Sequence, residues 1–219
     1  INFRQRWKTE NLFCEENFSA AKYPMYDVDE EGIIYTSILV KDDFMINLHK
    51  VVPTKENLVF REGGYPLGFD EGSPEITSVD QAEMAAINGK LTFVRNLCGY
   101  TEQFKAQGFH EMVGGSNSRY HRSVVPYFGH ESKINDSFYF ATMVCGRVGN
   151  DSIKQMMALV KSFRLESNSA YIHFYDGEEA FIQIGDLTDV TISLKGEEIS
   201  GPVVMARASK TKKKVVFHK

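Results

Sequence analysis

The sequence has few cysteines and no long apolar run, and both shortages exclude classes of protein. Its three cysteines, Cys14, Cys98 and Cys145, are odd in number and lack a paired metal-ligand spacing. A disulfide scaffold is therefore excluded, and no metal or other cofactor is expected. No apolar stretch approaches the roughly 18 residues that cross a bilayer, and the first 20 residues lack a signal-peptide pattern. We expect a protein without membrane contact, located in the cytoplasm, another intracellular compartment or a virion.

Positive charge is also scarce over the whole chain. Lys and Arg number 25 against 29 Asp and Glu, which gives a formal net charge of −4 and a pI near 5.9. This balance excludes a globally basic nucleic-acid binder but allows a local basic face. Residues 207–219 show such a local excess, because they carry six basic residues and no acidic one.

Apolar runs rich in β-branched residues are what the chain has in quantity. Residues 33–40 and 44–52 are two such runs, separated by Lys41-Asp42-Asp43, and this pattern predicts a β-hairpin. Further strands are predicted at residues 138–148, 170–175, 180–184 and 190–194. The expected fold class is α+β, with strand-rich antiparallel sheets, one well-defined amphipathic helix and one or two short helices.

The amphipathic helix is predicted at residues 151–164. Its apolar residues recur at the i, i+3, i+4, i+7 spacing of a buried helical face: Ile153, Met156, Met157, Val160 and Phe163. Asn150 or Asp151 can cap its start. A second, short helix is predicted at residues 79–88, with Ser78 as N-cap and Gly89 as its stop.

The chain length of 219 residues is compatible with one domain or two. Residues 108–123 include the run Gly114-Gly115-Ser116-Asn117-Ser118-Arg119, which has the composition of a linker or mobile loop. We therefore predict a strand-rich N-terminal domain at residues 1–120 and a β-α-β-β-β C-terminal domain at 121–219. A single domain remains the alternative.

Cys145 is the first candidate for a catalytic nucleophile, and Cys98, which precedes Gly99, is a second. Cys145 precedes Gly146, and four distant histidines are available as bases: His49, His121, His130 and His173. A cysteine-dependent hydrolase is therefore one hypothesis. However, Cys145 lies within an apolar strand, where a free cysteine usually packs as a small buried hydrophobe. For this reason no catalytic residue is assigned, and the scattered histidines predict no metal site.

Several basic residues form a possible nucleic-acid surface. Lys154 and Lys161 are seven residues apart and share the polar side of the predicted helix, which Arg147 and Arg164 bracket. Such a helix can lie across phosphates without reading bases. Near the glycine-rich loop, Arg119 and Arg122 can also hold a phosphate. These six residues are the predicted DNA-binding set.

The order strand, helix, strand, strand, strand over residues 138–194 resembles one repeat of a DNA sliding clamp, the processivity-factor fold of replisomes. The segments that carry the resemblance are FYFATMV (138–144), IKQMMALV (153–160), AYIHF (170–174) and AFIQIGD (180–186). In that family the helix lines a central hole and its basic face meets the duplex. The resemblance implies DNA contact by Lys154 and Lys161.

The expected function is therefore a non-enzymatic binding or assembly protein, most concretely a clamp-like homo-oligomer that encircles duplex DNA. Two alternatives stay open. One is a structural protein of a viral particle or tail, because the long Gly- and Pro-containing loop at residues 62–78 suits contacts between subunits. The other is the hydrolase that uses Cys145.

Overall fold

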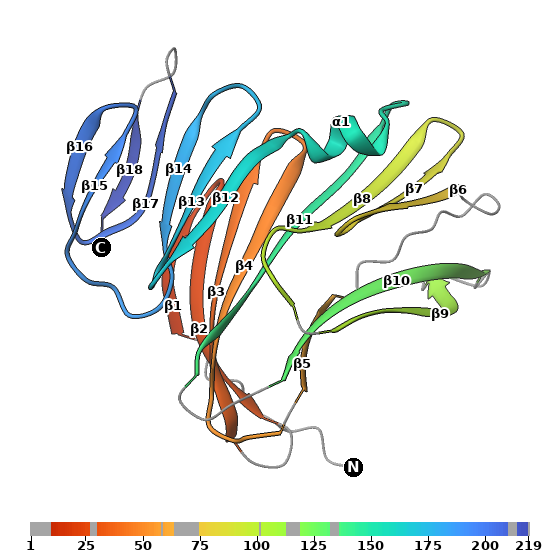
Figure 1. The fold of residues 1–219 in the computed structure, drawn as a ribbon, viewed down its shortest axis with the longest axis horizontal. Coiled ribbons are helices and arrows are strands. Elements are labelled where there is room, and N and C mark those ends of the chain that lie inside the picture. The colour runs from red at the N-terminus through yellow and green to blue at the C-terminus, as the bar shows by residue number, and fades with distance from the viewer. Residues whose placement is uncertain are drawn as a thin grey trace.

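The computed structural model describes residues 10–26, 30–57, 59–63, 75–100, 102–112, 119–131, 136–209 and 214–218. These residues form eighteen β-strands and one short α-helix (Figure 1). Every strand pair is antiparallel, so the prediction of strand-rich antiparallel sheets is confirmed. None of the described helical segments is long and apolar enough to cross a membrane.

The largest sheet has eight strands in the order β1-β2-β3-β4-β11-β8-β7-β6. Their bounds are β1 Glu10–Glu15, β2 Phe18–Tyr26, β3 Glu30–Lys41, β4 Phe44–Pro53, β6 Glu75–Val79, β7 Ala82–Ile87, β8 Lys90–Asn96 and β11 Phe138–Val148. The first four strands form a meander. Strand β11 joins this meander to β8, because it pairs with β4 on one side and β8 on the other.

The β3–β4 hairpin confirms the predicted pairing of residues 33–40 with 44–52. Its turn consists of Asp42 and Asp43, and Asp42 has a φ of 52°. Aspartate tolerates this left-handed region better than most residues, which suits a tight hairpin turn. The turn also fixes the register, which places Thr36 directly opposite His49.

A five-stranded sheet in the order β12-β13-β14-β17-β18 packs on one face of the eight-stranded sheet (Figure 1). Its strands are β12 Val160–Glu166, β13 Ser169–Phe174, β14 Glu179–Gln183, β17 Val203–Ala208 and β18 Val215–His218. Leu48 and Met143 of the larger sheet share one core cluster with Ile172 and Ile182 of the smaller sheet. Because side chains alternate along a strand, the residues next to these four in sequence point to the two outer faces of this sandwich.

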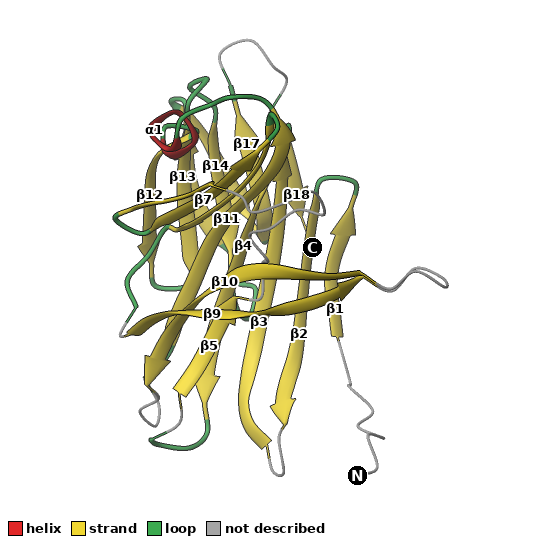
Figure 2. Ribbon diagram, turned by 90° about the vertical axis from the view of Figure 1, so that its right-hand side faces the viewer, coloured by secondary structure: helices red, strands yellow, loops and turns green. Residues whose placement is uncertain are grey.

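A three-stranded sheet in the order β5-β10-β9 lies on the opposite side of the eight-stranded sheet. It consists of β5 Val59–Gly63, β9 Glu102–Met112 and β10 Arg119–Glu131. Phe60 of β5 packs against Val51 and Phe140 of the larger sheet. Figure 2 shows that β9 and β10 run across the direction of β2 and β3. The molecule therefore has three layers of sheet.

A hairpin of β15 (Val190–Leu194) and β16 (Glu197–Gly201) covers part of the outer face of the five-stranded sheet. Ile192, Leu194 and Ile199 of this hairpin form a second core cluster with Phe181 of β14.

The predicted helix at residues 151–164 is wrong over most of its length. The helix α1 covers only Ile153–Met157, where Ser152 and Gln155 form a capping box. The following residues form β12, which contains a bulge between Val160 and Ser162. The bulge shifts the alternation, so that Val160 and Phe163 both pack on the core. A three-residue spacing that looked helical therefore belongs to a bulged strand.

The second predicted helix, at residues 79–88, is also wrong. Strand β6 ends at Val79, β7 begins at Ala82, and the two pair as a hairpin. The side chain of Ser78 donates a hydrogen bond to Glu83 across this hairpin instead of capping a helix. Gly89 lies in the β7–β8 turn with a φ of 72°, a conformation that favours glycine.

The predicted linker at residues 108–123 overlaps two long paired strands. Residues 108–112 belong to β9 and 119–123 to β10, which pair along their whole length. Residues 113–118, with most of the glycine-rich run, lie outside the described residues. A division of the chain near residue 120 stays a prediction.

Candidate functional site

A pocket of about 110 Å³ lies on the outer face of the eight-stranded sheet, where β5 meets it. We call it the His49 pocket. Its lining residues are Tyr23, Ile34, His49, Val51, Phe60, Arg61, Glu62 and Phe140. Strand alternation explains this set, because Ile46 and Leu48 of β4 point into the core while His49 and Val51 point outward. The site therefore combines titratable groups with an aromatic wall.

Tyr23, Thr36 and His49 form a hydrogen-bonded series across β2, β3 and β4. The Thr36 hydroxyl donates to the Tyr23 hydroxyl over 3.2 Å and lies 2.9 Å from Nδ1 of His49. A hydroxyl has a single proton to donate. The tautomer that fits a Thr36 donation to Tyr23 has Nδ1 of His49 donating to Thr36 and Nε2 as the proton acceptor of the ring.

Burial lowers the pKa of His49 from 6.5 to about 4. The imidazole is therefore neutral near pH 7 and can accept a proton at Nε2. A ligand that brings a negative charge beside the ring opposes this shift, because an opposite charge favours the protonated form. The base strength of His49 thus depends on what occupies the pocket.

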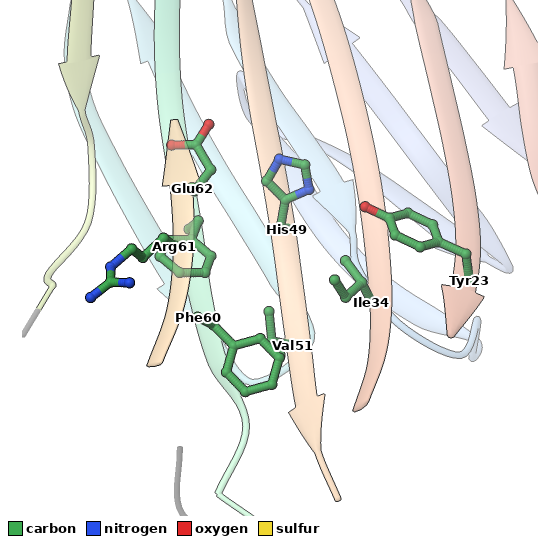
Figure 3. A pocket seen from close by; sticks show the side chains of 8 residues that line it. Tyr23, Ile34, His49, Val51, Phe60, Arg61 and Glu62 are labelled. Atoms are coloured by element: carbon green, nitrogen blue, oxygen red, sulfur yellow. The ribbon is translucent and has the colours of Figure 1, made fainter. Parts of the chain in front are cut away.

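Charged groups from β5 stand beside the imidazole. Glu62 is 8% exposed, and the hydroxyl of Thr142 on β11 donates to its Oε2 over 2.6 Å. Arg61 is exposed at the edge of the pocket. In Figure 3 the Tyr23 hydroxyl points toward His49 from one side, while Glu62 and Arg61 lie on the other. The pocket therefore offers hydrogen-bond acceptors close to the ring and a cation further out.

The chemistry that this arrangement supports is proton transfer and anion binding. No group of three or more His, Cys, Asp or Glu side chains in the described ranges can hold a metal ion. A volume of about 110 Å³ lies well below the roughly 300 Å³ of a typical pocket that encloses a small molecule. We infer that the pocket can hold one substituent of a larger ligand, while the rest of that ligand runs over the surface.

Sequence reasoning considered His49 only as a partner for Cys145 and missed Tyr23, Thr36 and Glu62. One signal was available. The two-residue turn at Asp42 and Asp43 fixes the hairpin register, and this register alone puts Thr36 opposite His49. The approach of β5 has no comparable local signal, because it depends on contacts between distant parts of the chain.

Contrary to the sequence prediction, the structure does not place Lys154 and Lys161 on one helix. Lys154 is exposed on α1, whereas Lys161 is exposed on β12. Arg147 of β11 forms ion pairs with Asp43 and Asp151, over 2.9 and 2.7 Å.

The remaining three arginines lie on strands. Arg164 of β12 pairs with Glu166 over 3.1 Å. Arg119 and Arg122 belong to β10, and their side chains lie outside the described residues. The clamp resemblance placed Lys154 and Lys161 on one helix, and the structure has only Lys154 on a helix. DNA contact by the six residues stays a prediction.

Cys145 is a buried core residue. Its side chain is 1% exposed, and its sulfur lies 3.3 Å from the carbonyl oxygen of Asp43. Burial raises the pKa of the thiol to about 11, so the thiolate that a nucleophile requires is rare near pH 7.

Comparison with known proteins gives a likeness of fold. No family model matches the chain, and no curated protein matches it. Heparan sulfate lyase HepC from Pedobacter heparinus is similar in structure, with a TM-score of 0.53 and 10% identity over 80% of this chain and 28% of the lyase. A mutant of that lyase has a TM-score of 0.52 and 11% identity, over 89% of this chain and 28% of the mutant lyase. A heparinase III has a TM-score of 0.52 and 9% identity, over 80% of this chain and 27% of the heparinase.

The chain thus spans less than a third of the length of these lyases. The expectation of a clamp-like DNA processivity factor is wrong, because the likeness in fold is to part of heparan sulfate lyases and the helix that carried the resemblance ends at Met157. This likeness does not support the two alternatives, a viral structural protein and a hydrolase that uses Cys145, and the buried thiol of Cys145 opposes the hydrolase.

Proposed function

We propose that this chain is a β-sheet domain of the polysaccharide-lyase type and that its His49 pocket binds an acidic polysaccharide. The observation that carries this proposal is the hydrogen-bonded series Tyr23, Thr36 and His49 in a surface pocket. The likeness in fold to heparan sulfate lyases supports the ligand class. Because the chain has a net charge of −4, attraction of the polyanion is local, at Arg61 on the edge of the pocket.

Cleavage of a uronate-containing chain by β-elimination needs two proton transfers. A base removes the proton from the carbon beside the carboxylate, a carbon–carbon double bond forms, and the bond to the glycosidic oxygen on the next carbon breaks. An acid then protonates that oxygen. Neutral His49 can act as the base through Nε2, and the Tyr23 hydroxyl can act as the acid.

Thr36 connects the two groups, so no proton is lost from the site. When Tyr23 gives its proton to the leaving oxygen, Thr36 can replace it, and Nδ1 of His49 can replace the proton of Thr36. The imidazole gains one proton at Nε2 and gives one up at Nδ1. A ligand carboxylate or sulfate in the pocket also raises the pKa of His49 from about 4 toward the working pH.

The experiment is incubation of the protein with heparan sulfate. The double bond formed by elimination is conjugated with the carboxylate, so ultraviolet absorbance rises as the polymer is cut. We expect His49→Ala and Tyr23→Phe each to slow this rise by roughly 10²- to 10⁴-fold, as loss of a general acid or base does. A neutral glucan serves as the control substrate, because it has no carboxylate. Absence of the absorbance with every uronate-containing polysaccharide would remove the elimination role.

A further inference from the structure

A second, larger groove lies on the outer face of the five-stranded sheet. We call it the outer groove. Its volume is about 380 Å³, which lies within the roughly 300 to 1,000 Å³ of pockets that hold small-molecule ligands. It faces away from the eight-stranded sheet, whereas the His49 pocket faces away from the five-stranded sheet. The two hollows are therefore on opposite sides of the sandwich.

The floor of the outer groove is set by the strand register. Ser162, His173 and Glu179 are cross-strand neighbours on β12, β13 and β14, and they point outward. Arg164 and Tyr171 form the next outward pair. The floor thus presents hydroxyl, imidazole, carboxylate and guanidinium groups side by side.

The β15–β16 hairpin forms one wall and fixes the carboxylate of the floor. Ser193 and Leu194 line the groove from β15. The side chain of Lys195 pairs with Glu179 over 3.0 Å, and its backbone N–H donates to the same carboxylate over 2.9 Å. Burial acts to raise the pKa of Glu179, but these contacts from Lys195 outweigh it and leave the pKa below its ordinary value. Glu179 is therefore an ionised, oriented acceptor.

Arg164 is positioned and still accessible to a ligand. Its guanidinium lies 4.8 Å from the centre of the Tyr171 ring. Its ion pair with Glu166 is exposed on both sides, with 64% of the Arg164 side chain accessible. Exposed ion pairs of this kind contribute little net free energy, so a ligand anion can compete for the guanidinium.

Several polar groups of the groove have bonding capacity left. Among the described residues, no side-chain hydrogen bond involves Ser162, His173 or Ser193. Polar donors and acceptors around a guanidinium suit a ligand that carries both hydroxyl groups and an anionic group. An apolar ligand would leave these groups without partners, at a cost in binding free energy.

We propose that the outer groove is a second saccharide-binding site, which takes an anionic sugar unit through Arg164, His173 and Ser162. The ligand class rests on the function proposed above. The position on the opposite side of the sandwich makes this a holding site, which binds a separate stretch of polysaccharide and takes no part in proton transfer.

Calorimetric titration with a short, size-fractionated heparan sulfate oligosaccharide tests the assignment. The wild type is expected to bind two equivalents. His49→Ala is expected to keep the outer equivalent, and Arg164→Ala to keep the pocket equivalent while binding at the groove weakens about tenfold or more, as expected for a lost charge-assisted hydrogen bond. Lys161→Ala is the matched control, because Lys161 is an exposed cation of the same strand that does not line the groove.

The outcomes separate the two proposals. Two equivalents in the wild type, a second equivalent at least tenfold weaker in Arg164→Ala, and two unchanged equivalents in Lys161→Ala support the outer site. A single equivalent that is lost in His49→Ala and unchanged in Arg164→Ala overturns the outer site and leaves the His49 pocket standing. Loss of binding in Arg164→Ala alone overturns the pocket and keeps the groove. Equal affinity for sodium sulfate would reduce the groove to an anion site and overturn its assignment to a sugar.

Discussion

At the scale of single residues, Thr36 connects the two titratable groups of the His49 pocket. Its hydroxyl contacts both Tyr23 and His49, so it selects the tautomer in which Nδ1 carries the proton and Nε2 accepts one. In the reaction that we propose, it also provides the path by which Tyr23 regains a proton. The residue does not have to touch the ligand to influence the reaction, which makes it a positioning residue.

Replacement of Thr36 by valine keeps the shape of the side chain and removes the hydroxyl. We expect the rate of cleavage at saturating heparan sulfate to fall about tenfold, the equivalent of one hydrogen bond of roughly 1 to 1.5 kcal/mol, while the affinity for the polymer is unchanged. Thr36→Ser keeps the hydroxyl and should retain most of the rate. Equal rates for the valine and wild-type proteins would show that the series plays no part in proton transfer.

The stability of the protein should depend on the protonation of His49. The pKa is about 4 in the folded protein and 6.5 in the unfolded chain, so between these values the unfolded state binds more protons. The free energy of unfolding therefore falls as the pH drops from 6.5 to 4. Protonation of His49 accounts for a total fall of about 3 kcal/mol. Urea unfolding near pH 7 and near pH 4 measures it.

His49→Asn is the reference for this comparison, because asparagine has a donor in a similar position and does not titrate. We expect its loss of stability over the same pH range to be smaller by about the same 3 kcal/mol. If the wild type and His49→Asn lose stability in parallel, the imidazole is not buried as described.

At the scale of elements, the β3–β4 turn is tied to the five-stranded sheet by a buried lysine. The side chain of Lys41 is 1% exposed and lies 2.8 Å from Asp176 and 3.4 Å from Glu178 in the β13–β14 connection. Arg207 of β17 pairs with Glu178 over 2.6 Å. Burial acts to lower the pKa of Lys41, but these two carboxylates outweigh it and leave the pKa above its ordinary value, so the lysine stays charged.

Lys41→Met should therefore be strongly destabilising, because it leaves a buried carboxylate without one of its cations. We expect the free energy of unfolding to fall by about 3 kcal/mol or more. Lys22→Met is the control, since Lys22 pairs at 3.4 Å with an Asp186 that is 80% exposed, and loss of such a pair costs under about 1 kcal/mol. Chemical denaturation of both variants gives the two values; a Lys41 effect no larger than the Lys22 effect contradicts the buried network.

Elements with a local cause were predictable from the sequence, and elements shaped by tertiary pairing were not. The hairpin at residues 33–52 follows from two apolar runs and a two-residue turn. The helix at 151–164 fails because the bulge after Val160 gives a strand the spacing of a helix. The prediction of a helix at residues 79–88 is wrong because short apolar segments fit a helix and a hairpin equally well until their partner strands are known.

At the scale of the whole molecule, three layers of sheet place two hollows on opposite sides. The strand-rich fold class was predictable from the composition and from the apolar runs rich in β-branched residues. The insertion of β11 between β4 and β8 was not, because β11 pairs with residues about 90 to 100 positions away on β4 and about 50 positions away on β8. The His49 pocket depends on the same long-range contacts, since Phe60 and Glu62 reach it from β5. The site therefore exists only once the fold is complete.

The most direct test of the central claim is to follow the imidazole of His49 by NMR during a pH titration, with and without a heparan sulfate oligosaccharide. If the pocket binds the acidic sugar, the pKa of His49 should rise from about 4 toward its ordinary value when the oligosaccharide is present. Binding at the outer groove is followed separately, through the NMR signals of His173 and through the Arg164→Ala variant. A His49 pKa that stays at about 4 at saturating oligosaccharide would mean that no anionic sugar enters the pocket.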